Sequence, residues 1–170
     1  MKRHFMMMAS YNAWANNRLF DAAGVLSAEE WQRETGAFFK SMMATLNHLL
    51  ASDRIWLKRM TGKGDAPNNL DAIIHRELDL LRAARLDEDR RIIEWIDSLS
   101  EDALRGRFSY LTISELRTVS QRLAPALAHL FNHQTHHRGQ AHAILTTLGQ
   151  PSISLDMIVF QRTPEGIRFA

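Results

Sequence analysis

The segment LAHLFNHQTHHRGQAHAILTTLG, from Leu127 to Gly149, carries the pattern that decides both the fold and the candidate chemistry. Its apolar residues recur every three or four positions, which indicates an α-helix. Such a helix places His133 and His137, which are four residues apart, on one face about 6 Å from each other. Because imidazole is the commonest protein ligand for transition metals, this pair predicts a metal-binding site.

A third ligand must come from another segment of the chain. His48 is the only further histidine within a strong helical pattern, MMATLNHLLASDRIWLKRM, at residues 42–60. We therefore predict a three-histidine metal site that joins two helices far apart in sequence. The alternative is a structural role for each histidine, since a spacing of four residues also arises by chance in a histidine-rich helix.

The other histidines of the segment are weaker candidates. His129 lies one turn before His133 on the same face, so it is the main rival ligand or an outer partner of the site. His136 is offset from its neighbour by about 100° and should point away from the ion. His142 is only partly on the ligand face.

Helical periodicity continues through most of the chain and predicts an all-α fold. Further long helices are expected over residues 5–23, 42–60 and 73–99, with the histidine helix running from Arg117 or Ser120 to Leu148. Ser27 and Glu30 have the spacing of a capping box and predict a short helical turn. Four long helices with short connections indicate a four-helix bundle, a fold whose interior commonly holds metals.

A few segments depart from this pattern. Residues 108–113 alternate apolar and polar side chains, which predicts a short extended segment before the last helix. The tail SLDMIVFQRTPEGIRFA is apolar enough to pack back on the bundle. Gly139 lies inside the histidine helix, where glycine costs about 1 kcal/mol relative to alanine, so we expect another helix to approach closely there.

Composition restricts the class of protein. A length of 170 residues fits one domain, covering residues 1–170, and the absence of cysteine excludes disulfides, thiolate zinc sites and a protein cysteine nucleophile. A net charge of +2 does not favour nucleic-acid binding. Arginines 82, 85, 90 and 91 alternate with acidic residues, which predicts a solvated helix face. No span is long and apolar enough for a membrane crossing, and we expect a cytoplasmic protein.

The chain resembles the DinB-like superfamily of small metal-binding helical proteins over nearly its whole length. The resemblance is carried by NHLLASDRIWLKRM at 47–60 and by the histidine segment about eighty residues later. The opening YNAWANNRLFDAA at 11–23 and the closing LDMIVFQR at 155–162 also match. The string HHRGQ at 136–140, with a histidine three residues before it, is the most specific part.

This resemblance implies a four-helix bundle of up-down-down-up topology. It also implies a divalent metal, usually nickel or zinc, held by three histidines at positions that match His48, His133 and His137 here. Some relatives carry a glutamate or another residue at the middle position, whereas this chain has the all-histidine version.

Three neutral ligands leave an open coordination position, as in catalytic zinc sites. The metal could activate water for hydrolysis, or it could bind a low-molecular-weight thiol, as thiol-dependent transferases resembling this superfamily are thought to do. We therefore expect a metal-dependent hydrolase or thiol transferase, and the alternative is a non-catalytic metal-binding or stress-response module.

Candidates for the pocket or the outer shell of the metal, besides His129, are Tyr11, Asn12, Trp14 and Asp53. Tyr11 and Trp14 have packing in the core as their alternative role. The methionine-rich start, Met6 to Met8, predicts a homodimer formed through the first helix.

Overall fold

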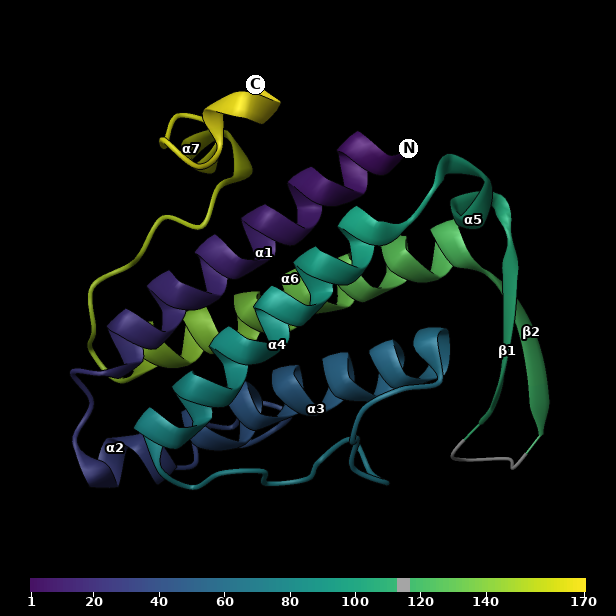
Figure 1. The fold of residues 1–170 in the computed structure, drawn as a ribbon. Coiled ribbons are helices and arrows are strands. Elements are labelled where there is room, and N and C mark those ends of the chain that lie inside the picture. The colour runs from purple at the N-terminus through teal and green to yellow at the C-terminus, as the bar shows by residue number, and fades with distance from the viewer. Residues whose placement is uncertain (113–116) are drawn as a thin grey trace.

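The structure, a computed structural model, describes residues 1–112 and 117–170. Four long helices, α1, α3, α4 and α6, form a bundle in which α1 and α3 each pack against both α4 and α6 (Figure 1). The elements, in chain order, are α1 (Lys2–Ala23), α2 (Ala28–Gln32), α3 (Met42–Thr61), α4 (Leu78–Ser98), α5 (Glu101–Arg105), β1 (Arg107–Leu111), β2 (Thr118–Arg122), α6 (Leu123–Thr147), α7 (Met157–Phe160) and a 3-10 turn (Ile167–Phe169).

The directions of the long helices confirm the expected all-α, up-down-down-up bundle. In Figure 1, α1 and α6 run one way, and α3 and α4 run the other way. Local signals in the sequence account for several helix ends. Ser27 and Glu30 form the predicted capping box, and Ser41 accepts a hydrogen bond from the backbone N–H of Ala44 at the start of α3. Gly149, with φ +79°, follows the last turn of α6.

Helix α4 begins at Leu78, five residues later than the predicted start at residue 73. The buried side chain of Asn47 on α3 explains the difference, because it binds the preceding segment in an extended form. Its Oδ1 accepts hydrogen bonds from the backbone N–H groups of Ile74 and His75, and its Nδ2 donates to the carbonyl of His75. These backbone groups are therefore engaged by a side chain and do not enter a helix.

The predicted extended segment is one strand of a β-hairpin. β1 and β2 are antiparallel, with Arg107 opposite Arg122 and Leu111 opposite Thr118. The prediction that the last helix begins at Arg117 or Ser120 was therefore wrong, because residues 118–122 pair with β1 before α6 begins at Leu123. Ile113, the last residue of the predicted segment, lies outside the described residues.

The bundle interior contains charged groups as well as an apolar core. Arg85 is only 2% exposed, and its guanidinium forms ion pairs with Asp53 at 2.8 Å and with Asp89 at 3.0 Å. The prediction that the arginine-rich run of α4 is a solvated face was therefore wrong for Arg85. It is correct for Arg90, which is exposed and pairs with exposed Asp87.

The tail packs on the bundle as predicted, and Phe160 of α7 is fully buried against Tyr11 and Ala15 of α1. The expectation for Gly139 was wrong, because a Cβ at this position would meet no atom within 4 Å. Gly139 instead lines an open cavity beside Tyr11.

The three methionines at 6–8 pack against the chain's own apolar clusters, so the homodimer stays a prediction. Within the described part of the chain, no helix combines the length and the apolar character that a membrane crossing requires.

Candidate metal centre

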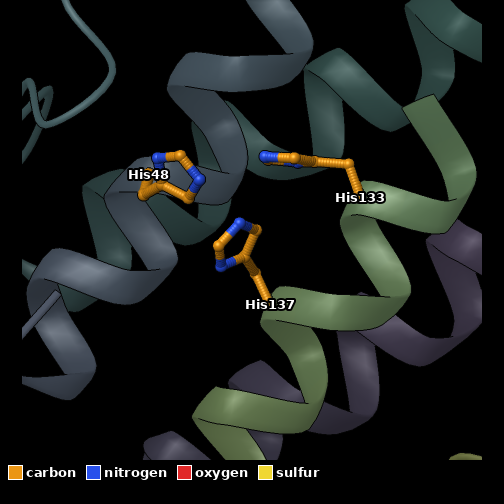
Figure 2. Close-up of side chains that lie close together, drawn as sticks. All are labelled: His48, His133 and His137. Atoms are coloured by element: carbon orange, nitrogen blue, oxygen red, sulfur yellow. The ribbon is translucent and has the colours of Figure 1, made fainter. Parts of the chain in front are cut away.

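The three predicted ligands meet where α3 packs against α6. His48 comes from α3, and His133 and His137 come from successive turns of α6 (Figure 2). Each ring offers a nitrogen, and these three nitrogens all lie within 4.8 Å of one another. Nitrogens bound tetrahedrally to zinc at about 2.0–2.1 Å are about 3.4 Å apart, so modest ring rotations would close them around one ion. The donor set therefore fits a divalent metal.

Burial keeps these imidazoles uncharged. It lowers the pKa of His48 to about 4, with a smaller contribution from nearby His137, while the hydrogen bond to Leu70 and the charge of Asp71 act in the opposite direction. Burial and the neighbouring histidines lower the pKa of His133 to about 3, and burial also lowers the pKa of His137. Neutral rings present the lone pairs that metal binding requires, so the site is ready for an ion at neutral pH.

Two hydrogen bonds orient the ligand rings. Nδ1 of His48 lies 2.7 Å from the carbonyl oxygen of Leu70, and Nδ1 of His137 lies 2.8 Å from Oε1 of Gln140. Both oxygens are acceptors, so Nδ1 of each ring carries the proton and Nε2 presents its lone pair, which in His48 lies 3.4 Å from the hydroxyl of Ser52. Contacts of this kind fix the tautomer of metal-binding histidines.

These partners were missed by sequence reasoning. Gln140 could have been found, because it lies three residues after His137 on the same helix face. The carbonyl of Leu70 could not, since it belongs to an irregular segment that Asn47 holds against α3.

An aromatic side chain covers one side of the site. The ring of Phe39 stacks on His48 with centroids 3.8 Å apart, and it meets the ring of His137 edge-on at 5.4 Å. Phe39 belongs to the turn before α3, in which Lys40 adopts a positive φ of 66°. Its neighbour Phe38 is 78% exposed. No pattern in the sequence pointed to Phe39.

His129 and His136 lie outside the three-nitrogen group. The exposed His129 has its ring 5.8 Å from that of His133 and packs edge-on against Trp56 at 4.9 Å. His136 is exposed, as expected, and lies within hydrogen-bonding distance of Gln140. His142, also outside the group, is 3.0 Å from the hydroxyl of Ser152 near the start of the tail.

The other candidate residues occupy two different surroundings. The rings of Tyr11 and Trp14 pack against Phe160, and the hydroxyl of Tyr11 donates to the carbonyl of Leu155. Asn12 and Asp53 belong to the buried charge network of the bundle. Asn12 donates to Asp89 at 3.2 Å, and Asp53 pairs with Arg85.

This network reaches the metal centre through Gln134, which follows His133 in the sequence. Nε2 of Gln134 donates to Oδ1 of Asp53 at 2.6 Å and to the carbonyl of Leu49 at 2.9 Å. Since Leu49 follows His48, one side chain joins the two ligand-bearing helices next to the site. The network thus helps to set the distance between the ligands.

Comparisons with known proteins agree with this architecture. The model of the DinB family matches residues 1–166. Protein DinB of Bacillus subtilis (strain 168) is 26% identical over 152 residues, which cover 86% of this chain and 87% of that protein. A crystal structure of a DinB-like protein from Bacillus cereus ATCC 10987 has the same fold, with a TM-score of 0.71 at 15% identity, over 88% of this chain and 94% of the other. The chain therefore belongs to the DinB family.

Proposed function

We propose that His48, His133 and His137 bind one divalent metal ion, nickel or zinc, and that the protein is a metal-dependent enzyme. The observation that carries this proposal is the convergence of three uncharged imidazoles from two helices, with their nitrogens within 4.8 Å. Three neutral ligands leave the full charge of the ion uncompensated, and uncompensated charge favours binding of an anionic hydroxide or thiolate.

The coordination number supports an open site. Structural zinc sites have four protein ligands, whereas catalytic sites have three and an open position. Among the described residues, the group contains three histidines and no carboxylate. A bound metal would lower the pKa of water or of an external thiol, and the chain has no cysteine that could occupy the position instead.

The residues around the ligands have distinct tasks in this proposal. Leu70 and Gln140 hold the rings of His48 and His137 in the metal-binding tautomer. Phe39 shields one side of the site from water. In this proposal Phe39 limits access to the ion from the side on which it packs against His48 and His137.

The same covering by Phe39 favours the second candidate function, a non-catalytic metal-binding module. In that case the ion is enclosed and exchanges no ligand. The two functions therefore differ in whether an external molecule can coordinate the metal.

Elemental analysis of tag-free protein purified without chelator tests the first step. We expect near-stoichiometric nickel or zinc in the wild type, and loss of the metal in His48→Ala and His137→Ala while circular dichroism stays helical. His129→Ala serves as the control on the same helix and should retain the metal. A wild type that cannot be loaded with any divalent metal would refute the proposal.

Cobalt substitution tests the open position. Addition of 2-mercaptoethanol should produce a sulfur-to-cobalt charge-transfer band in an enzyme that uses a thiol. A shift of the cobalt spectrum with pH but not with thiol supports hydrolysis by metal-bound water. A wild-type spectrum that changes with neither supports the non-catalytic module, and a response that appears only in Phe39→Ala identifies Phe39 as the group that encloses the ion.

A further inference from the structure

A second candidate site lies beyond the metal centre, between the C-terminal half of α3 and strand β1. A cavity of about 590 Å³ opens there, with Ile55, Lys58, Arg59, Pro67, Tyr110 and Leu111 among its lining residues. This volume is in the range of pockets that hold small organic ligands, which is about 300–1,000 Å³.

The charged residues that line the described part of the cavity are all cations. Its described lining residues include two cations, Lys58 and Arg59, and no aspartate or glutamate. Two other cavities of similar volume each include a carboxylate, from Asp156 in one and from Glu94 in the other. Within residues 1–112 and 117–170, neither Lys58 nor Arg59 forms an ion pair, unlike Arg54 of the same helix, which approaches Glu88 at 3.7 Å.

Two aromatic rings hold Arg59 in place. Its guanidinium carbon lies 4.8 Å from the ring centroid of Trp56 and 4.7 Å from that of Tyr110, and these rings meet edge-on at 5.7 Å. Cation–π contacts of this kind fix the position of the guanidinium but use none of its five N–H donors. Among the described residues, no hydrogen-bond acceptor meets these donors, although Arg59 is half-buried.

The helix end does not explain this arrangement. Basic residues are favoured in the last turn of a helix, which accounts for the presence of Lys58 and Arg59 near Thr61. This preference does not account for the β-hairpin that places Tyr110 over Arg59. A planar guanidinium that is held by two rings, and that has no anionic partner among residues 1–112 and 117–170, matches the two oxygens of a carboxylate, phosphate or sulfonate.

We propose that this cavity binds an organic anion, with its charged group on Arg59 and its apolar part against Ile55, Tyr110 and Leu111. The site does not depend on the metal, and none of the three histidines lines the cavity. Trp56, which holds Arg59, also contacts His129, and His129 lies next to His133. The cavity itself is lined by α3, by the loop that follows it and by β1.

Two dyes of similar shape test the proposal on the full chain. 8-Anilino-1-naphthalenesulfonate is anionic, and N-phenyl-1-naphthylamine is its neutral counterpart. We expect Arg59→Gln to weaken binding of the sulfonate about tenfold or more, as for loss of a charged hydrogen bond, and to leave the neutral dye unchanged. The sulfonate affinity of Arg59→Lys should lie between those of the wild type and Arg59→Gln, because lysine keeps the positive charge but lacks the planar guanidinium. Arg90→Gln, on the exposed face of α4, is the control.

The location is read by NMR, since the amide signals of Gly62 and of residues 109–112 should shift when the sulfonate binds. Lys58→Gln provides a variant at an exposed position that cannot disturb packing, and it should also weaken the sulfonate selectively. Unchanged sulfonate affinity in both Arg59→Gln and Lys58→Gln would overturn the proposal. Equal weakening of both dyes, or signal shifts confined to another part of the chain, would overturn it as well.

Discussion

Replacement of Arg85 by methionine should destabilise this protein far more than the same change at Arg90 on the same helix. Arg85 is 2% exposed and is the counterion of two buried carboxylates, Asp53 and Asp89, which are 1% and 4% exposed. Removal of one partner from a buried ion pair leaves an uncompensated charge and costs about 3–5 kcal/mol. Arg90 pairs with Asp87 in solvent, with side chains 67% and 73% exposed, and such pairs contribute about 0–1 kcal/mol.

The assay is urea denaturation of metal-free protein at pH 7, followed by circular dichroism. Because a domain of this size has a free energy of unfolding of about 5–15 kcal/mol, a loss of about 3–5 kcal/mol in Arg85→Met should remove about a fifth of it or more. A variant that also carries Asp53→Asn and Asp89→Asn should recover most of the loss, since neutral groups need no counterion.

The pH dependence gives an independent check of the cause. Burial raises the pKa of Asp53 to about 7 even with Arg85 beside it, because the guanidinium offsets only part of the effect of burial. Loss of Arg85 raises this pKa further, so the folded variant binds more protons than the unfolded chain above about pH 4. Its free energy of unfolding then falls as the pH rises, and the deficit of Arg85→Met should be smaller at pH 5 than at pH 8. If Arg85→Met and Arg90→Met agree within about 1 kcal/mol at pH 7, the reasoning about buried charge is wrong.

Three further predictions follow from single residues. The pKa of His48 is lowered to about 4 in the folded state, so the unfolded chain binds more protons below pH 6.5. The free energy of unfolding of the metal-free protein should therefore fall by about 2 kcal/mol between pH 6.5 and 5 because of this group. In His48→Ala, the free energy of unfolding measured with urea should depend less on pH than in the wild type. Parallel pH profiles of the two proteins would contradict this. Gln140→Ala should weaken zinc binding about 10–100-fold in a chelator competition, since it frees the ring of His137, whereas an unchanged affinity would assign Gln140 no orienting role. Gly139→Ala should raise the free energy of unfolding by about 0.5–1 kcal/mol, because the position is helical and open, and a loss of stability would mean that the backbone is close-packed after all.

The convergence of His48, His133 and His137 could be predicted from the sequence because much of their geometry is local. The spacing of His133 and His137 is a property of one helix, and the strong pattern around His48 identified the only other helix with a histidine in a comparable setting. Burial, by contrast, depends on neighbours. Arg85 has the same local sequence character as Arg90, and only the packing of α4 against α3 separates them.

Pairing between segments was also beyond local reasoning. Residues 118–122 form a strand because β1 lies beside them, and their own composition does not distinguish a strand from the first turn of a helix. The carbonyl of Leu70 and the ring of Phe39 reach the site from irregular segments. Periodicity carries no information about such segments, so their contacts with His48 had no signal in the sequence.

The contacts around Gln134 indicate that the arrangement of the three histidines does not depend on a metal. Leu49 and Gln134 each follow a ligand in the chain, and the hydrogen bond of 2.9 Å between them fixes the two helices one residue away from His48 and His133. Small zinc domains fold only with their metal, because no other interaction holds their ligands together. In this protein the apolar core and the buried network hold α3 against α6 without it. Metal affinity should consequently respond to changes in ring orientation, at Leu70 or Gln140, while the helical fold persists when a ligand is lost.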